Sequence, residues 1–184
     1  MLIAEQKKQE NIAEYILLMY QIEDLVRSAE FDLDVIVESF VKPQLPDDSF
    51  LEANRKWYAD LIKQMKAQHL HKSGHILEIK EILVELSYLH NSMLGASSAD
   101  GKYKGVVDRA IPFVDEFKER SNLKDMNHIE IALHAMYMKL LLRLQKKEIT
   151  AETEEAFDAM RMMLAFLSRA YKQMKAGDMN FMNN

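Results

Sequence analysis

The chain has 184 residues and a formal net charge of −5, with 48% hydrophobic and 29% charged residues, a balance typical of one soluble globular domain. Its five glycines and three prolines leave few residues for tight turns, which argues against β-sandwiches and barrels. The absence of cysteine excludes disulfides, iron–sulfur clusters and thiol catalysis, and the acidic balance argues against a nucleic-acid partner.

Apolar residues recur at three- and four-residue intervals along the whole chain, which predicts an all-α fold. One long amphipathic helix is expected over residues 3–28, and a short second helix over 33–41, capped by Asp32. Pro43 and Pro46 then interrupt the chain, because neither can donate a helical hydrogen bond.

The third and fourth helices are expected on either side of a glycine. Asp47 or Asp48 can cap the third helix, and Gly74 can end it by adopting a left-handed conformation. The fourth helix is expected over 76–94, where apolar residues form a seam suited to packing in a bundle. Residues 95–105 hold three of the five glycines and predict a flexible loop.

Three further helices complete the chain. The fifth is expected over 106–120, where Pro112 either kinks or splits it. Asn127 can cap the sixth, over 128–147, which is apolar on nearly every face and is therefore expected at the centre of the fold. Thr150 can cap the last helix, whose first turn carries glutamates favourable to the helix dipole.

The tail at 177–184 is expected to be frayed. No internal repeat divides the chain, and its two halves do not differ in composition. We therefore predict a single domain over residues 1–184, built as a bundle of six or seven mostly antiparallel helices.

Charged residues also bear on the location of the protein. Acidic and basic side chains begin at Glu5, so the opening stretch cannot form the apolar region of a signal peptide. The most apolar window, residues 129–144, carries Glu130, Lys139 and Arg143 and is too short to span a bilayer. These features predict a cytoplasmic protein with no membrane partner.

Two stretches resemble a known family. Residues 1–27, from MLIAEQKKQENIAEY to YQIEDLVR, and residues 140–148, LLLRLQKKE, resemble a family of helical proteins from gut bacteria. The family is known only as a domain of unknown function. The resemblance implies an all-helical domain over nearly the whole chain, and it implies no catalytic residue and no ligand.

The histidines near the end of the third helix do not form a convincing metal site. His69, His71 and His75 lie close in sequence, but zinc requires three or four ligands that converge on one point. No Glu-x-x-His pair occurs, which excludes the di-iron sites of ferritin-like bundles. We expect these histidines to be solvated, and we expect neither a metal nor a cofactor.

Three glutamates share one face of the fourth helix. Glu78, Glu81 and Glu85 have i, i+3 and i+7 spacing and resemble half of the magnesium site of helical nucleotide pyrophosphohydrolases. The next helix lacks the second Glu-x-x-Asp pair that such enzymes need. A solvated acidic stripe is the favoured interpretation, and serine-nucleophile motifs are also missing.

Several polar residues fall on apolar helix faces. Glu23, His90 and Arg143 occupy positions where the periodicity predicts core residues. Because burial of a lone charge is unfavourable, we predict that Glu23, with Asp24, meets Arg143 and either His90 or His134. Such a cluster would orient a small polar ligand or shift the pKa of His90. Alternatively, these residues only fix the register of the helices, or their long side chains reach solvent from the helix faces.

Methionine is unusually frequent, with 13 residues. Methionines fill cores, and those left outside form apolar stripes that mediate self-association. The leading hypothesis is a non-enzymatic interaction module that forms a homodimer, or binds a protein partner, through its N-terminal or last helix. The alternative is a ligand-binding or enzymatic bundle with a pocket near Glu23, Arg143 and His90.

Overall fold

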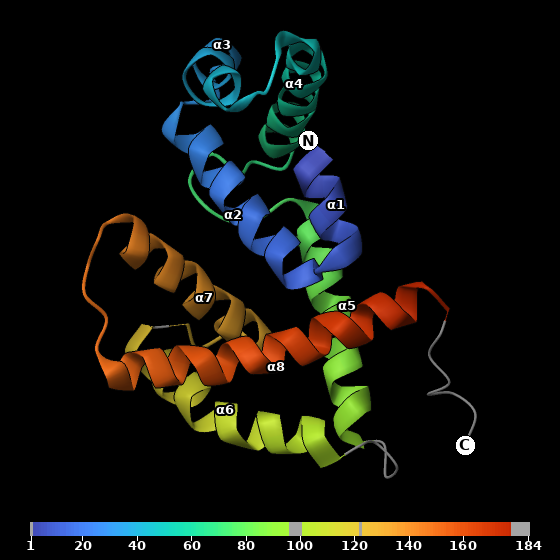
Figure 1. Cartoon of the computed structure of the whole chain (residues 1–184), viewed down its shortest axis with the longest axis vertical. Coiled ribbons are helices and arrows are strands. Elements are labelled where there is room, and N and C mark those ends of the chain that lie inside the picture. Colours follow the sequence, from blue (N-terminus) through green and yellow to red (C-terminus); the bar gives the residue numbers. More distant parts are fainter. Residues whose placement is uncertain (1, 96–100, 122, 178–184) are drawn as a thin grey trace.

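A computed structural model describes residues 2–95, 101–121 and 123–177. Within these ranges the chain forms eight α-helices and no strand (Figure 1), so the predicted all-α class is confirmed. The helices are α1 (Leu2–Glu10), α2 (Ile12–Ser28), α3 (Leu33–Ile36), α4 (Leu51–Ala67), α5 (Leu77–Gly95), α6 (Gly101–Ser121), α7 (His128–Leu144) and α8 (Ala151–Lys175).

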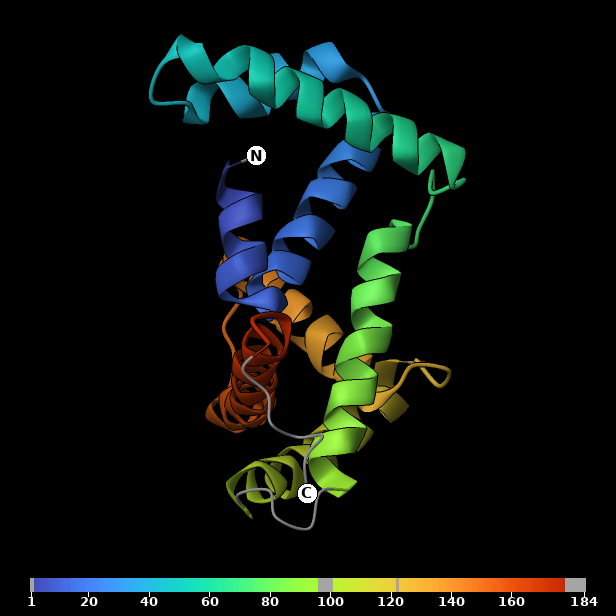
Figure 2. The ribbon, with the colours of Figure 1, turned by 90° about the vertical axis from the view of Figure 1, so that its right-hand side faces the viewer.

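The helices cross one another more than the prediction of mostly antiparallel neighbours implies. α5 runs along the long axis of the molecule in both views, whereas α8 runs across Figure 1 and is seen end-on in Figure 2. α4 likewise lies across one end of the molecule (Figure 2). α6 and α8 lie side by side and run antiparallel. Ridge-into-groove packing permits such crossings wherever the apolar face of a helix is broad.

The helix expected over 3–28 is broken at Asn11, which raises the number of helices from the predicted six or seven to eight. The backbone of Asn11 is extended, with φ −151° and ψ 98°. Its side-chain oxygen accepts a hydrogen bond from the Glu14 N–H at 3.3 Å. A short amide side chain that caps the next turn competes with continuation of the helix. α1 therefore folds back against α2.

The third predicted helix is shorter than expected at both ends. Asp47 caps a short 3₁₀ turn that precedes α4, rather than α4 itself. α4 ends at Ala67 because His69 adopts the left-handed conformation, with φ 57°. Gly74 is also left-handed, with φ 91°, but it lies within the connection to α5.

Other predicted boundaries agree closely with the structure. The helix expected over 33–41 is α3 extended by a π-helical turn, and the helix expected over 76–94 is α5. Asn127 caps α7 in a reciprocal arrangement with Glu130, and Thr150 caps α8.

The prediction of a flexible loop over 95–105 is partly wrong, because α6 already begins at Gly101. Residues 96–100 lie outside the described ranges. Pro112 does not split α6, which continues on both sides of it. The tail expected to fray at 177–184 lies outside the described residues from position 178 onward.

Buried apolar side chains from all eight helices form one continuous cluster. α7 supplies eight buried residues and contacts α2, α5, α6 and α8, as expected for a central helix. Its C-terminal part is not buried, since Leu144 is 67% exposed. α8 also contacts α2, α5 and α6, and it therefore shares the central position with α7.

Candidate functional site

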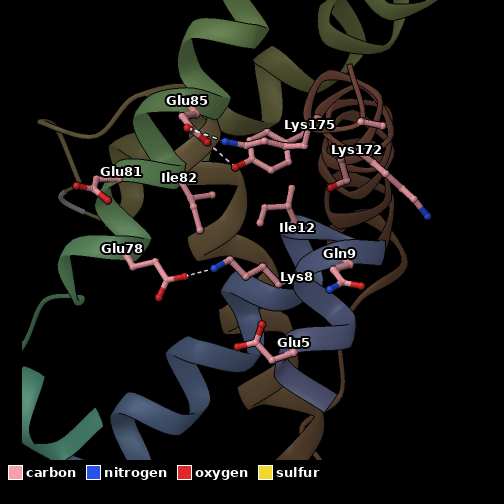
Figure 3. A pocket seen from close by; sticks show the side chains of 13 residues that line it. Glu5, Lys8, Gln9, Ile12, Glu78, Glu81, Ile82, Glu85, Lys172 and Lys175 are labelled. Carbon is pink, nitrogen blue, oxygen red and sulfur yellow. Dashed lines mark hydrogen bonds and ion pairs between the residues drawn. The ribbon is translucent and has the colours of Figure 1, made fainter. Parts of the chain in front are cut away.

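A cleft of about 690 Å³ opens between α1, α5 and α8 (Figure 3). Side chains of both charge signs face this space, and Ile12 and Ile82 form an apolar floor between them. Seven charged residues line the cleft: Glu5, Glu78, Glu81, Glu85, Lys8, Lys172 and Lys175.

Two ion pairs join α5 to the other walls of the cleft. Glu78, in the first turn of α5, pairs with Lys8 of α1. Two helical turns further on, Glu85 accepts a hydrogen bond from Lys175 of α8 at 2.8 Å. The Tyr171 hydroxyl donates to the second oxygen of Glu85 at 2.5 Å. The cleft therefore has an ammonium and a carboxylate at each end.

At the α8 end of the cleft, hydrogen bonding keeps the Glu85 carboxylate ionised. Burial alone would raise the pKa of Glu85, but the hydrogen bonds from Lys175 and Tyr171 outweigh burial and hold that pKa below its ordinary value. Burial and the hydrogen bond to Glu85 raise the pKa of Tyr171. Glu85 is therefore charged, while Tyr171 keeps its proton and serves as a donor.

A second hollow of about 200 Å³ adjoins the cleft, since Glu5 and Glu78 line both. Its walls include Trp57 of α4 and Tyr15 of α2. Burial and the neighbouring Glu78 raise the pKa of Tyr15. The hollow therefore extends the cleft toward α4, and aromatic side chains form part of its walls.

The glutamate stripe of α5 forms one wall of the cleft, which the interpretation as a solvated face did not anticipate. Glu78 and Glu85 are half-buried and paired, whereas Glu81 is exposed. Among the described residues, no group of three or more acidic or histidine side chains is arranged to hold a metal ion.

The lysines that pair with the glutamates of α5 could not be identified from the sequence. Lys8 lies 70 residues from its partner Glu78, and Lys175 lies 90 residues from Glu85. Tyr171 lies on the buried face of α8, so hydrophobic spacing alone does not indicate that its hydroxyl has a polar partner. No local spacing links these residues, and only the tertiary fold brings them together.

Glu23 is buried as predicted, with 0% exposure, but its partners are not the expected ones. One oxygen accepts a hydrogen bond from the Ile76 N–H at 2.9 Å, and the other lies 2.5 Å from Nδ1 of His75. The His75 ring stacks on Tyr20 at 3.8 Å between centroids. His75 is therefore a structural partner rather than the solvated side chain that we expected.

Asp24 takes part in a neighbouring network. Its carboxylate accepts a hydrogen bond from the Tyr137 hydroxyl at 2.6 Å and pairs with Arg27 at 2.7 Å. Arg27 also donates to the backbone carbonyls of Leu70 and Gly74. Together with Glu23, this network ties α2 to the connection between α4 and α5, and to α7.

Glu23 hydrogen-bonds to neither His90 nor His134 within the described part of the chain. Nδ1 of His90 is 2.7 Å from the Tyr103 hydroxyl, which joins α5 to α6. Burial and the charge of His128 lower the pKa of His90. Burial and the charge of His75 lower the pKa of His134, whose ring lies near Phe117.

Arg143 is exposed and hydrogen-bonds to Glu154 at 3.2 Å. Lys139, one turn earlier on α7, is the buried cation and pairs with the same glutamate at 2.5 Å. The predicted cluster of Glu23 with Arg143 and His90 is therefore wrong as a set of direct contacts, because each member pairs with a different residue. A long arginine side chain reaches solvent from a helix face, which hydrophobic periodicity does not reveal.

We predict that Glu23→Ala lowers the free energy of unfolding by about 3 kcal/mol, because it leaves the buried Ile76 N–H without an acceptor and removes the partner of His75. Urea denaturation of the variant measures the change. Glu119→Ala, at an exposed position of α6, is the matched control and should change stability by less than about 0.5 kcal/mol. Equal stabilities of the two variants would contradict the structural role of Glu23.

Acid should destabilise the protein partly through His90. The pKa of His90 is lowered in the folded state from the ordinary value of 6.5, so the unfolded chain binds more protons as pH falls below 6.5. The stability present at pH 7.5 is then lost progressively toward pH 5. Urea denaturation of His90→Asn should show a shallower loss, with exposed His71→Asn as the control. An unchanged pH dependence in His90→Asn would contradict this assignment.

Comparison with known proteins gives a family and no further relative. A family model described as a domain of unknown function, DUF4924, matches residues 1–178. Neither the curated proteins nor the solved structures gave a significant match. Because the family model spans nearly the whole sequence, the chain belongs to this family of helical domains of unknown function.

Proposed function

We propose that the chain is a single-domain, non-enzymatic binding protein whose charged cleft holds a small polar molecule. The observation that carries this proposal is the cleft of about 690 Å³, with an ion pair at each end and an apolar floor. Its volume lies in the range of small-molecule sites, and such sites combine apolar surface with a few convergent polar groups. The continuous core shared by all eight helices supports a single domain.

The location of this proposed site differs from the one expected from sequence. Glu23 and Asp24 hydrogen-bond within the protein, and Arg143 lies on the surface. The cleft instead uses side chains whose bonding capacity is only partly filled, since an ammonium has three donors and a carboxylate oxygen has two lone pairs.

A thermal-shift screen against small amines, acids, zwitterions and sugars tests the proposal. A compound present at about 100 times its dissociation constant stabilises the fold by about 2.7 kcal/mol, which raises Tm by roughly 5–10 °C. Lys175→Gln should reduce that rise because it removes one wall charge of the cleft. Lys80→Gln, at an exposed position of α5 outside the cleft, should leave it unchanged. A screen in which no compound changes Tm would contradict the proposal.

Self-association is a second candidate function, favoured by an apolar stripe on α5. Leu77, Val84 and Tyr88 lie on one helix face and are 56%, 69% and 68% exposed. The sequence had suggested the N-terminal or last helix, where Ile3 and Met162 are exposed to 63% and 41%. Exposed apolar stripes of this kind favour pairing with a second copy of the chain.

Size-exclusion chromatography with light scattering tests this candidate. We expect a mass of twice 21.4 kDa at micromolar concentration, and a monomer for Val84→Lys, because a charge on the stripe opposes burial. Ala53→Lys, on the exposed face of α4, adds the same charge elsewhere and should not alter the mass. A monomeric wild-type protein would exclude the dimer.

Further expectations from sequence stay predictions. These are a cytoplasmic location, a bacterial origin and the absence of a nucleic-acid partner. Within the described residues, no helix is both long and apolar enough to cross a membrane.

A further inference from the structure

We propose a second binding site, for a medium-chain alkyl carboxylate, in a hollow between α2, α7 and α8. These three helices contact one another in every pair, and all three are labelled in Figure 1. The hollow has a volume of about 250 Å³ and shares no lining residue with the cleft. The inference therefore goes beyond the proposed function, and either site can fail alone.

The inner surface of the hollow is apolar. Met136 and Leu164 are buried, and Leu17 and Leu140 are half-buried against the core. Each of the three helices supplies two apolar lining residues: Ala13 and Leu17 from α2, Met136 and Leu140 from α7, and Leu164 and Ala165 from α8. An alkyl chain in the hollow exchanges contact with water for contact with these side chains, which is favourable in proportion to the apolar area removed from water.

Positive charge predominates among the charged residues that line the hollow. Among the described residues, these are Lys139 and Arg143 of α7, Arg161 of α8, and one anion, Glu14 of α2. Glu14 already pairs with Lys7 of α1. Arg143 and Arg161 are 62% and 57% exposed, so a ligand can reach both guanidinium groups from solvent. The hollow therefore attracts an anionic head group.

The carboxylates that pair with these cations do not cancel the positive charge. Glu154 pairs with both Lys139 and Arg143, at 2.5 and 3.2 Å, and Asp158 pairs with Arg161 at 3.2 Å. Neither acid lines the hollow. When both acids, and the lysine that pairs with the lining glutamate, are included, four cations still face three anions. The balance is positive by either reckoning.

Both arginines have donors to spare for a ligand. Within the described part of the chain, Arg143 donates one hydrogen bond, to Glu154, and Arg161 donates one, to Asp158. A guanidinium group has five N–H donors, and its planar shape matches that of a carboxylate. The head group of the ligand can therefore bond to either arginine without displacing the existing pair.

The distance along α7 sets the length of the alkyl chain. Met136 is buried and Arg143 is exposed, and the two are seven residues apart on this helix, which corresponds to about 10 Å at 1.5 Å per residue. Leu140 lies between them and also lines the hollow. An extended chain of about eight carbons spans about 9 Å, given C–C bonds of about 1.5 Å. Octanoate is therefore the probe whose length fits the site.

Isothermal titration of the full chain with straight-chain carboxylates tests the class of ligand. From butanoate to octanoate, each added methylene should tighten binding by up to about fourfold, because the hollow buries it. Octanol and octylamine should bind at least about fivefold more weakly than octanoate, because neither can form an ion pair with arginine. Equal binding of the three compounds, or no saturation by octanoate up to about 10 mM, would overturn the inference.

Variants test the location of the site. Arg143→Gln and Arg161→Gln should each weaken octanoate by about two- to fivefold and leave octanol unchanged. Arg120→Gln removes the same charge from an exposed ion pair of α6 outside the hollow, and it should leave every affinity unchanged. Ala165→Phe should abolish octanoate binding, because the new ring fills the hollow from an exposed position. Equal effects of the three arginine variants, or unchanged octanoate binding in Ala165→Phe, would overturn the assigned site.

Two further measurements separate this site from the cleft and from a membrane surface. Lys175→Gln, which removes a charge of the cleft, should leave octanoate binding unchanged. Loss of octanoate binding in this variant would place the ligand in the cleft and overturn the inference. Binding of the protein to vesicles of anionic phospholipid, without binding of free octanoate, would also overturn it.

Discussion

A buried carboxyl group, that of Glu23, attaches the start of α5 to α2. Glu23 is the least exposed charged side chain among the described residues, and in the interior it must have hydrogen-bond partners. It bonds to the backbone N–H of Ile76, directly before α5, and to His75. An N–H at the start of a helix has no acceptor within that helix. Glu23 therefore joins the start of α5 to the middle of α2.

That attachment, together with the apolar core, places one wall of the cleft. With its N-terminus held against α2, α5 presents Glu78 to α1 and Glu85 to α8. Half-exposed ion pairs contribute little to stability, so these contacts follow from the placement of α5 more than they cause it. Because they cost little to rearrange, these ion pairs are compatible with the binding function proposed above. The apolar core, rather than the cleft charges, supplies most of the stability.

Sequence periodicity predicted most of the helices, because burial of one face imposes a regular apolar spacing whatever its partner is. Apolar spacing did not reveal the break at Asn11, because the apolar pattern continues across the position where the Asn11 side chain caps α2. The prediction also placed the end of α4 at Gly74, whereas the chain already adopts a left-handed turn at His69. The position of Glu23 on an apolar helix face indicated that it is buried, but it did not indicate which residues bond to it. A charge on a helix face does not reveal which distant residue meets it, and the cleft lysines carried no local signal.

Hydrogen exchange of the Ile76 amide is the most direct test of this account. That amide precedes α5 and is 2.9 Å from the Glu23 carboxyl oxygen. If Glu23 holds the start of α5, the amide exchanges as slowly as amides in the middle of the helix, because it opens only when α5 separates from α2. Exchange as fast as that of an exposed loop amide would show that α5 is not held there, and the argument for a preformed cleft would be lost.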